Sequence, residues 1–310
     1  MALLDNRRRY GKKSEPDYSK KYLTFTALES GTFTLTIPGN VSTGLLTSIS
    51  YSTDNGASWT TTNNLPSQVV ITTPTISAGK SVLWKGIGRK MSSSSADGYY
   101  SNFSSTGRFT VSGNLLSLLF GNSVFSNIRT ITETYALAKI FFRCSKLEDA
   151  LNLSLIATRL SENCYLAMFQ YCTSLTTSPE LPATTLAKNC YSTMFYGCTS
   201  LTTAPSVLPA TTLVGYCYNN MFNSCTSLKT APVLPATTLV ERCYQNMFAG
   251  CAKLNYIKAM FTTTPGSSYT SNWVYNIAYR GTFVMNAAAT WYITGSNGIP
   301  SGWTVQTASS

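Results

Sequence analysis

The sequence predicts a β-rich chain in which a β-sandwich precedes a solenoid of stacked repeats. In the second half, a motif built on cysteine, tyrosine, methionine and phenylalanine recurs at a nearly constant spacing. In the first part, several short runs of alternating apolar and polar residues are separated by turn residues. A fixed period of about 20 to 50 residues indicates a repeat architecture, and short alternating runs indicate antiparallel strands. A chain of 310 residues has room for both parts.

The strand-like runs lie in residues 22–112. One of them alternates Leu23, Phe25 and Ala27 with threonine, and Asp54-Asn55-Gly56 between two others is a strong hairpin signal. Several short strands with closely spaced turns favour an Ig-like β-sandwich over this range. The stretch of residues 91–106 is poor in large aliphatic side chains, so we expect a mobile loop there.

Each repeat begins with the pattern Cys-Tyr-x-x-Met-Phe-x-x-Cys, which recurs at spacings of 26, 27 and 26 residues. Its first cysteines are Cys164, Cys190, Cys217 and Cys243. An earlier and less regular copy has Ile140, Phe141 and Cys144 at the equivalent positions. When such units stack, equivalent residues form ladders along the stack.

Within one unit the hydrophobic period changes. Cys217, Met221 and Cys225 stand at i, i+4 and i+8, which is the spacing of one face of a short helix. The following sequence is rich in threonine, and Pro232 and Pro235 exclude regular helix from it. Each unit is therefore predicted to contain a short helix, a turn and an extended segment. One unit alone buries too little apolar surface to offset its ordering entropy, so neighbours must cover each other.

The repeats need a cap at each end, because an open end would expose apolar side chains. An apolar segment over residues 113–125 predicts the N-terminal cap of a solenoid that spans residues 113–262. Gly-rich turns after it predict a C-terminal β cap over residues 263–310. That cap contains Trp273, Trp291 and Trp303. We expect these tryptophans to pack inside the cap, with stacking on a sugar as the alternative.

Catalytic and metal-binding groups are scarce. The chain has no histidine, which excludes Ser-His and Cys-His nucleophile pairs. Eight of the nine cysteines form Cys-x₇-Cys pairs, whereas zinc sites use shorter spacings, often with histidine. We therefore expect buried thiols that pack as small hydrophobes, and neither a metal nor a cofactor. The acids mostly stand singly, unlike the paired carboxylates of a glycosidase, so we predict no catalytic residues and no enzyme.

The net charge of +11 is unevenly spread. Residues 1–21 form a basic arm with seven Lys or Arg residues and three acids. The candidate docking residues in this arm are Arg7, Arg8, Arg9, Lys12 and Lys13. A basic arm favours an acidic partner, either nucleic acid or an acidic protein surface, and a solvated tail is the alternative. No apolar run is long enough to span a membrane, and no secretory apolar region follows the basic residues, so we expect the chain to stay in the cell that makes it.

The residue after each strand leucine varies between units, and we expect these residues to lie in register on the surface of the stack. The resulting ligand-binding candidates are Thr176, Thr202, Lys229 and Asn255. The alternative is that they are simply solvated. Only 11% of the residues are charged, so the surface would offer mainly neutral hydrogen-bonding groups, which suit sugars or other protein surfaces.

The repeats resemble the BspA-like leucine-rich repeats of surface proteins from gut Bacteroidales and of phages that infect them. The resemblance covers residues 113–305. It rests on Cys-Tyr-x-x-Met-Phe-x-x-Cys-x-Ser-Leu, on Leu-Pro-Ala-Thr-Thr-Leu and on the closing Gly-Ile-Pro-Ser-Gly-Trp. It implies a right-handed α/β solenoid with capping ends and, by analogy, a role in adhesion.

The order of basic arm, β-domain and repeats is similar to that of fibre or decoration proteins of crAss-like phages. This similarity implies a virion protein, made in the host cytoplasm, whose arm docks on other virion proteins. The repeats would face a host-surface protein or glycan. The similarity also implies a homo-oligomer, with a trimer favoured, and it favours protein over nucleic acid as the partner of the arm. A bacterial cell-surface adhesin is the alternative, and a glycan-cleaving enzyme is a third.

Overall fold

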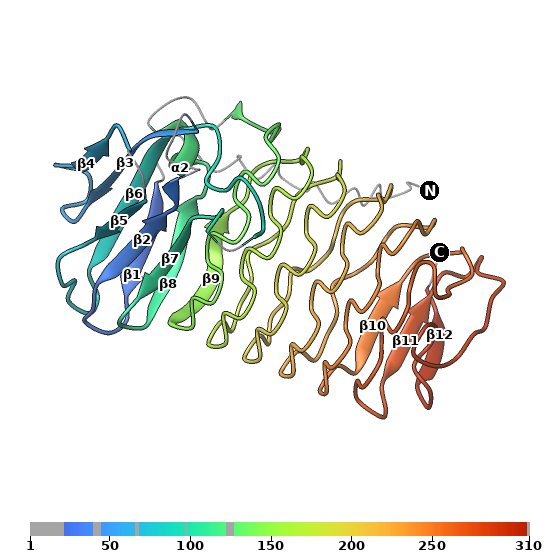
Figure 1. Cartoon of the computed structure of the whole chain (residues 1–310). Helices are drawn as coiled ribbons and strands as arrows, with labels where there is room; N and C mark the ends of the chain where they lie inside the picture. Colours follow the sequence, from blue (N-terminus) through green and yellow to red (C-terminus); the bar gives the residue numbers. More distant parts are fainter. Residues whose placement is uncertain (1–21, 40–44, 66–67, 97, 122–126, 309–310) are drawn as a thin grey trace, which may run out of the picture.

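The computed structural model describes residues 22–39, 45–65, 68–96, 98–121 and 127–308. The basic arm lies outside these ranges, together with its candidate docking residues Arg7, Arg8, Arg9, Lys12 and Lys13. The described part of the chain is β-rich and contains several sheets (Figure 1). No helix in it is long and apolar enough to cross a membrane.

Two sheets form the N-terminal part. The larger contains β4 (Thr60–Asn63), β3 (Leu46–Ser52), β6 (Ser81–Gly88), β1 (Leu23–Ala27), β8 (Phe109–Asn114) and β9 (Leu147–Ser154), in that order. The smaller contains β5 (Val69–Thr72), β2 (Phe33–Ile37) and β7 (Asn102–Ser105). All neighbouring pairs are antiparallel except β8 and β9. The strands β3 and β4 pair across the predicted Asp54-Asn55-Gly56 turn.

The two sheets pack face to face through aromatic side chains. Strands β1 and β2 alternate buried and half-buried residues, as the period of two predicts. Phe25 of the larger sheet lies 5.3 Å from Phe33 and 4.8 Å from Phe103 of the smaller one, measured between ring centroids. Trp84 on β6 lies 5.0 Å from Phe103. This aromatic layer is the core of the N-terminal part.

The larger sheet continues into the repeats. The predicted boundary between residues 112 and 113 falls inside β8, which pairs in parallel with β9 of the first coil. The Phe103 and Phe141 rings stack 5.8 Å apart, so the sandwich and the coils share one hydrophobic core. The short helix α2 (Ser117–Phe120) follows β8 and packs on β6. Its Ser117 hydroxyl accepts from the Leu23 N–H and donates to the Trp84 carbonyl.

The prediction of a mobile loop over residues 91–106 is wrong for most of this segment. It contains β7, and its backbone bonds to the first coil. The Met91 N–H donates to the Ala136 carbonyl at 2.7 Å, and the Phe103 N–H donates to the Ile140 carbonyl at 2.8 Å. The segment has few aliphatic side chains, but its backbone groups continue the hydrogen-bond ladder of the coils. This ladder holds it in place.

The predicted short helices of the repeats are also wrong, because residues 127–308 contain no α-helix. The Met-Phe segments form successive turns with a left-handed residue at every fourth position, for example Asn163, Ala167 and Tyr171. Alternate N–H groups bond within the turn, as Leu166 does to the Asn163 carbonyl. The N–H groups between them bond to the next coil, as Tyr165 does to the Cys190 carbonyl. A four-residue turn repeats the i, i+4, i+8 spacing of a helix.

Successive coils are stacked side by side along the chain (Figure 1), and the rings of equivalent core residues form columns across them. One column of stacked phenylalanines consists of Phe141, Phe169, Phe195, Phe222 and Phe248. A second column consists of Tyr165, Tyr191, Tyr218 and Tyr244. The second cysteine of each motif bonds across coils, as the Cys198 thiol does to the Phe169 carbonyl at 3.0 Å. Each coil therefore buries its neighbour's apolar face.

The C-terminal end is a parallel sheet of β10 (Tyr256–Ala259), β11 (Thr282–Met285) and β12 (Thr304–Thr307). The tryptophans of this end are buried. Each indole N–H donates to a backbone carbonyl: Trp273 to Gly298, Trp291 to Phe261 and Trp303 to Ala278. The rings thus fill the end of the core and do not offer an open face to a sugar.

Candidate functional site

The four candidate ligand-binding residues lie in the polar stripe beside the parallel hydrogen-bond ladder of the coils. In each unit the leucine before the candidate is buried, as Leu201 is before Thr202. The Thr202 N–H donates to the Thr176 carbonyl at 2.9 Å, and the Asn255 N–H donates to the Lys229 carbonyl at 2.9 Å. The coils of Thr202 and Lys229 are joined close by, where the Thr226 hydroxyl donates to the Thr199 carbonyl. The stack therefore holds the four residues in one row.

Their side chains are not equally available. Thr202, Lys229 and Asn255 are exposed, whereas Thr176 is half-buried. The Thr176 hydroxyl donates to the Glu148 carbonyl at 2.8 Å, and the Thr202 hydroxyl donates to the Thr176 carbonyl at 3.1 Å. Each of these hydroxyls donates its single hydrogen within the protein, so only its acceptor lone pairs remain for a ligand. A ligand would thus find acceptors at the threonines, an ammonium at Lys229 and an amide at Asn255.

The structure adds two residues that the sequence analysis missed. Thr203 and Thr230 each follow a candidate residue and are also exposed. Thr203 is exposed because the ladder is locally irregular. The N–H groups of Thr202 and Thr203 both donate to the Thr176 carbonyl, at 2.9 and 3.2 Å. Two consecutive side chains can then face solvent. The signal in the sequence was the pair of adjacent polar residues.

The N-terminal end of the row is acidic, and its carboxylates form ion pairs or hydrogen bonds within the protein. Arg108 on the sandwich contacts Glu29 at 2.8 Å and Glu148 on the first coil at 3.1 Å. The hydrogen bonds from Arg108 lower the pKa of Glu29. The Thr177 hydroxyl donates to the Asp149 carboxylate. These contacts join the sandwich to the coils and leave the exposed middle of the row neutral or basic.

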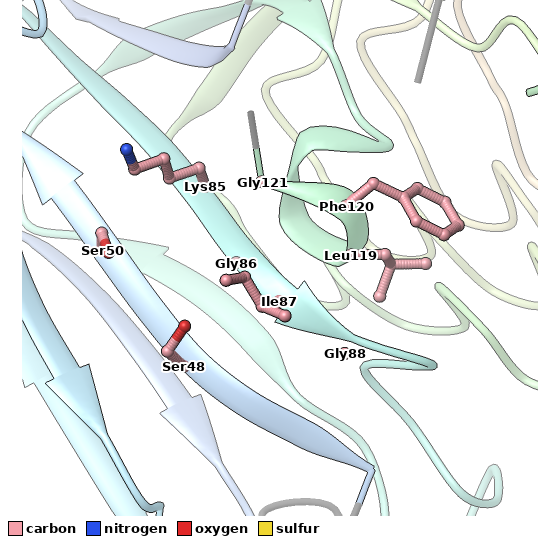
Figure 2. A pocket seen from close by; sticks show the side chains of 9 residues that line it. All are labelled: Ser48, Ser50, Lys85, Gly86, Ile87, Gly88, Leu119, Phe120 and Gly121. Atoms are coloured by element: carbon pink, nitrogen blue, oxygen red, sulfur yellow. The ribbon is translucent and has the colours of Figure 1, made fainter. Parts of the chain in front are cut away.

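A separate cavity of about 560 Å³ lies between β3, β6 and α2 (Figure 2). Its lining residues are Ser48, Ser50, Lys85, Gly86, Ile87, Gly88, Leu119, Phe120 and Gly121. The Lys85 ammonium lies 3.8 Å from the Trp59 ring centroid, and partial burial lowers its pKa. The Ser50 hydroxyl lies 2.8 Å from that of Thr61. The lining is mainly apolar and includes no carboxylate.

The thiols do not form a metal or nucleophile site in the described ranges. All nine cysteines are free and buried. Burial raises the pKa of Cys144 and Cys251 to about 12, which keeps these thiols protonated. Nowhere in the described part do three or more acidic or cysteine side chains come together as a metal would require.

Comparisons with known proteins found no match, since no protein-family model, no curated protein and no solved structure is similar to this chain. Function is therefore inferred from the residues and their geometry.

Proposed function

We propose that this chain is a structural and adhesion protein of a phage particle, a fibre or decoration component whose repeats bind a glycan or protein of the host surface. Residues 22–112 would be an Ig-like sandwich that serves as a spacer, and residues 113–262 a right-handed BspA-like leucine-rich-repeat solenoid. The face-to-face sheets and the columns of equivalent core residues support these assignments. The sequence resemblance supports the biological role.

The observation that carries the adhesive role is the exposed row of Thr202, Lys229 and Asn255 on hydrogen-bonded coils. Backbone bonds between coils fix the spacing of these side chains before any ligand arrives. Binding then costs little ordering entropy, which favours recognition of an extended partner. The neutral hydroxyls and the amide in and beside the row fit the hydroxyl groups of a glycan or the polar surface of a protein.

The row is tested by binding of the purified chain to host cells. A variant with Thr202→Ala, Lys229→Ala and Asn255→Ala should bind at least about tenfold more weakly than the wild type. The matched control is Thr211→Ala, Thr237→Ala and Thr238→Ala, which alters three exposed residues of the coils elsewhere. Equal loss in both variants, or no loss in the first, would reject the row as the binding surface.

Treatment of the cells with periodate or with protease before the binding measurement identifies the chemical class of the partner. Periodate oxidises vicinal diols of sugars, and protease removes surface protein. Loss of binding after periodate alone identifies a glycan, and loss after protease alone identifies a protein.

The virion role is tested through the basic arm. Deletion of residues 1–21 should abolish incorporation of the chain into particles, measured by mass spectrometry of purified phage, because seven basic residues would no longer meet an acidic virion surface. Normal incorporation rejects the arm as the anchor. Export of the intact chain from uninfected bacteria would instead support the alternative of a bacterial cell-surface adhesin.

A further inference from the structure

A second cluster of side chains lies on the turn segments of the first three coils, beside the segment that precedes β7, and all but Phe142 are at least partly exposed. We name it the aromatic–basic patch. It consists of Tyr100, Lys139, Phe142, Arg143, Tyr171 and Tyr196. Its ring centroids are linked in a chain, with 5.6 Å between Tyr100 and Phe142, 6.2 Å between Phe142 and Tyr171, and 5.4 Å between Tyr171 and Tyr196.

Three members of the patch stand where the backbone disfavours them. Lys139, Arg143 and Tyr171 have φ values of 59°, 58° and 61°. Large side chains rarely adopt this left-handed conformation, which suits glycine and asparagine. The equivalent positions of the other coils hold smaller residues: Gly197, Ser224 and Gly250 correspond to Arg143 and Tyr171, and Ala167, Thr193, Asn220 and Asn246 correspond to Lys139. At these two positions bulky residues occur only in the first two coils, although another left-handed position holds Tyr216 and Arg242 in later coils. The cluster of rings and cations around Arg143 therefore indicates a use beyond folding.

The Arg143 guanidinium packs on two aromatic rings. Its guanidinium carbon lies 5.0 Å from the Phe142 ring centroid and 5.8 Å from that of Tyr171. Within the described ranges no carboxylate oxygen lies within 4.0 Å of it, because the ion pairs there involve only Arg89 and Arg108. Stacking orders the guanidinium plane and leaves its N–H edge for a bidentate anion.

Lys139 adds a second positive charge to the patch, and Tyr171 adds an exposed ring. The Lys139 ammonium donates to the Ser95 carbonyl at 2.6 Å and lies 4.3 Å from the Tyr100 ring centroid. Tyr171 is 37% exposed. It leans over Gly197, where a Cβ atom would come within 2.6 Å of the ring. Glycine at that position therefore makes room for the tyrosine.

We propose that the aromatic–basic patch binds an acidic polysaccharide, with a sugar carboxylate on the Arg143 guanidinium and the adjoining sugar ring against Tyr171. One fixed guanidinium next to one exposed ring matches a uronic acid unit, which carries a carboxylate on an otherwise apolar-faced ring. The site uses a different segment of the coils from the row of Thr202, Lys229 and Asn255, and it does not depend on the virion role.

Two other anionic partners fit these residues less well. Nucleic acid binding draws its affinity from many phosphate contacts along a basic surface, whereas this patch has two cations. An acidic peptide would satisfy Arg143 but would gain little from an exposed tyrosine ring next to it. Both partners are outcomes of the test.

The test uses the full chain and isothermal titration with polygalacturonate, a polymer of uronic acid. Neutral mannan, polyglutamate and single-stranded poly(dT) are the comparison probes. We expect binding of polygalacturonate and at least about tenfold weaker binding of the other three. Arg143→Asn and Tyr171→Asn should each weaken polygalacturonate binding about tenfold or more. Asparagine is chosen because it tolerates the positive φ at both positions.

The matched control is Arg280→Asn, which removes the same charge from an exposed arginine of the C-terminal end. It should bind polygalacturonate like the wild type, as should the triple variant of Thr202, Lys229 and Asn255. Thermal melting checks that each variant is folded. Absence of polygalacturonate binding, equal effects of Arg143→Asn and Arg280→Asn, or equal binding of polyglutamate or poly(dT) would overturn the proposal.

Discussion

The rings of Tyr191 and Tyr218 lie 5.9 Å apart and within 5° of parallel. The Tyr218 hydroxyl is buried and has no hydrogen-bond partner in the described part of the chain. An unpaired buried hydroxyl is destabilising, whereas the ring itself stabilises the stack. The tyrosine column therefore combines favourable ring packing with the desolvation cost of its buried hydroxyls.

Tyr218→Phe keeps the ring and removes the hydroxyl, so it should raise the free energy of unfolding by about 1 kcal/mol or more. Tyr165→Phe should act in the same direction, because the Tyr165 hydroxyl is in the same situation. Urea unfolding measures both variants. A fall in stability would mean that a buried water molecule bonds to these hydroxyls in solution, which contradicts the prediction.

The cysteines should be inert in the folded protein. All nine are buried, and burial raises the pKa of Cys164 to about 12. The thiolate is the reactive form, so neither access nor ionisation is available at neutral pH. We expect no rapid labelling of the native chain by a disulfide reagent and labelling of all nine thiols in guanidinium chloride. Rapid native labelling of one or more thiols would show that a coil opens.

The repeat period and the hydrophobic positions were readable from the sequence, but the backbone conformation of the Met-Phe segments was not. A helix and a chain of four-residue turns place apolar side chains at the same spacing. The available signal for turns was Asn or Gly at every fourth position, as in Asn189 and Gly197. It was obscured because Thr193, Ala167 and Tyr171 occupy other left-handed positions.

The contacts between segments that are distant in the chain could not be predicted from the sequence either. The parallel pairing of β8 with β9 depends on the register between the sandwich and the first coil, which no local pattern records. The row of Thr202, Lys229 and Asn255 was predictable because equivalent positions of stacked units must align. The aromatic–basic patch was not, because it joins Tyr100 to residues of three coils.

The β3–β4 turn should make stability depend on pH in the acid range. Hydrogen bonds from the Ser58 side chain and N–H and from the Ser52 hydroxyl lower the pKa of Asp54 from 3.8 to about 2. The unfolded chain then takes up this proton first as the pH falls. The contribution of Asp54 is full above a pH of about 4 and is lost as the pH falls to about 2.

Asp54→Asn tests this dependence. The stability difference between wild type and variant, measured by urea unfolding, should shrink as the pH falls through that range, because the wild-type carboxylate becomes protonated and loses its advantage. A difference that stays constant with pH would show that Asp54 is not responsible.

Gly197 and Gly250 offer a matched pair of substitutions. Both have positive φ, 72° and 75°, so alanine should cost about 1 kcal/mol of stability at either position. At Gly197 the new Cβ atom would also meet the Tyr171 ring at 2.6 Å, whereas at Gly250 the nearest atom, the Ser224 hydroxyl oxygen, is 3.4 Å away. We therefore expect Gly197→Ala to be the more destabilising variant in urea unfolding.

The excess cost of Gly197→Ala should disappear in a Tyr171→Asn background, because the ring that clashes is then absent. The same clash pushes Tyr171 out of the aromatic–basic patch, so Gly197→Ala should also weaken polygalacturonate binding while Gly250→Ala leaves it unchanged. If Gly197→Ala destabilises the chain but binds polygalacturonate as the wild type does, the position of the Tyr171 ring over Gly197 matters for packing and not for the ligand.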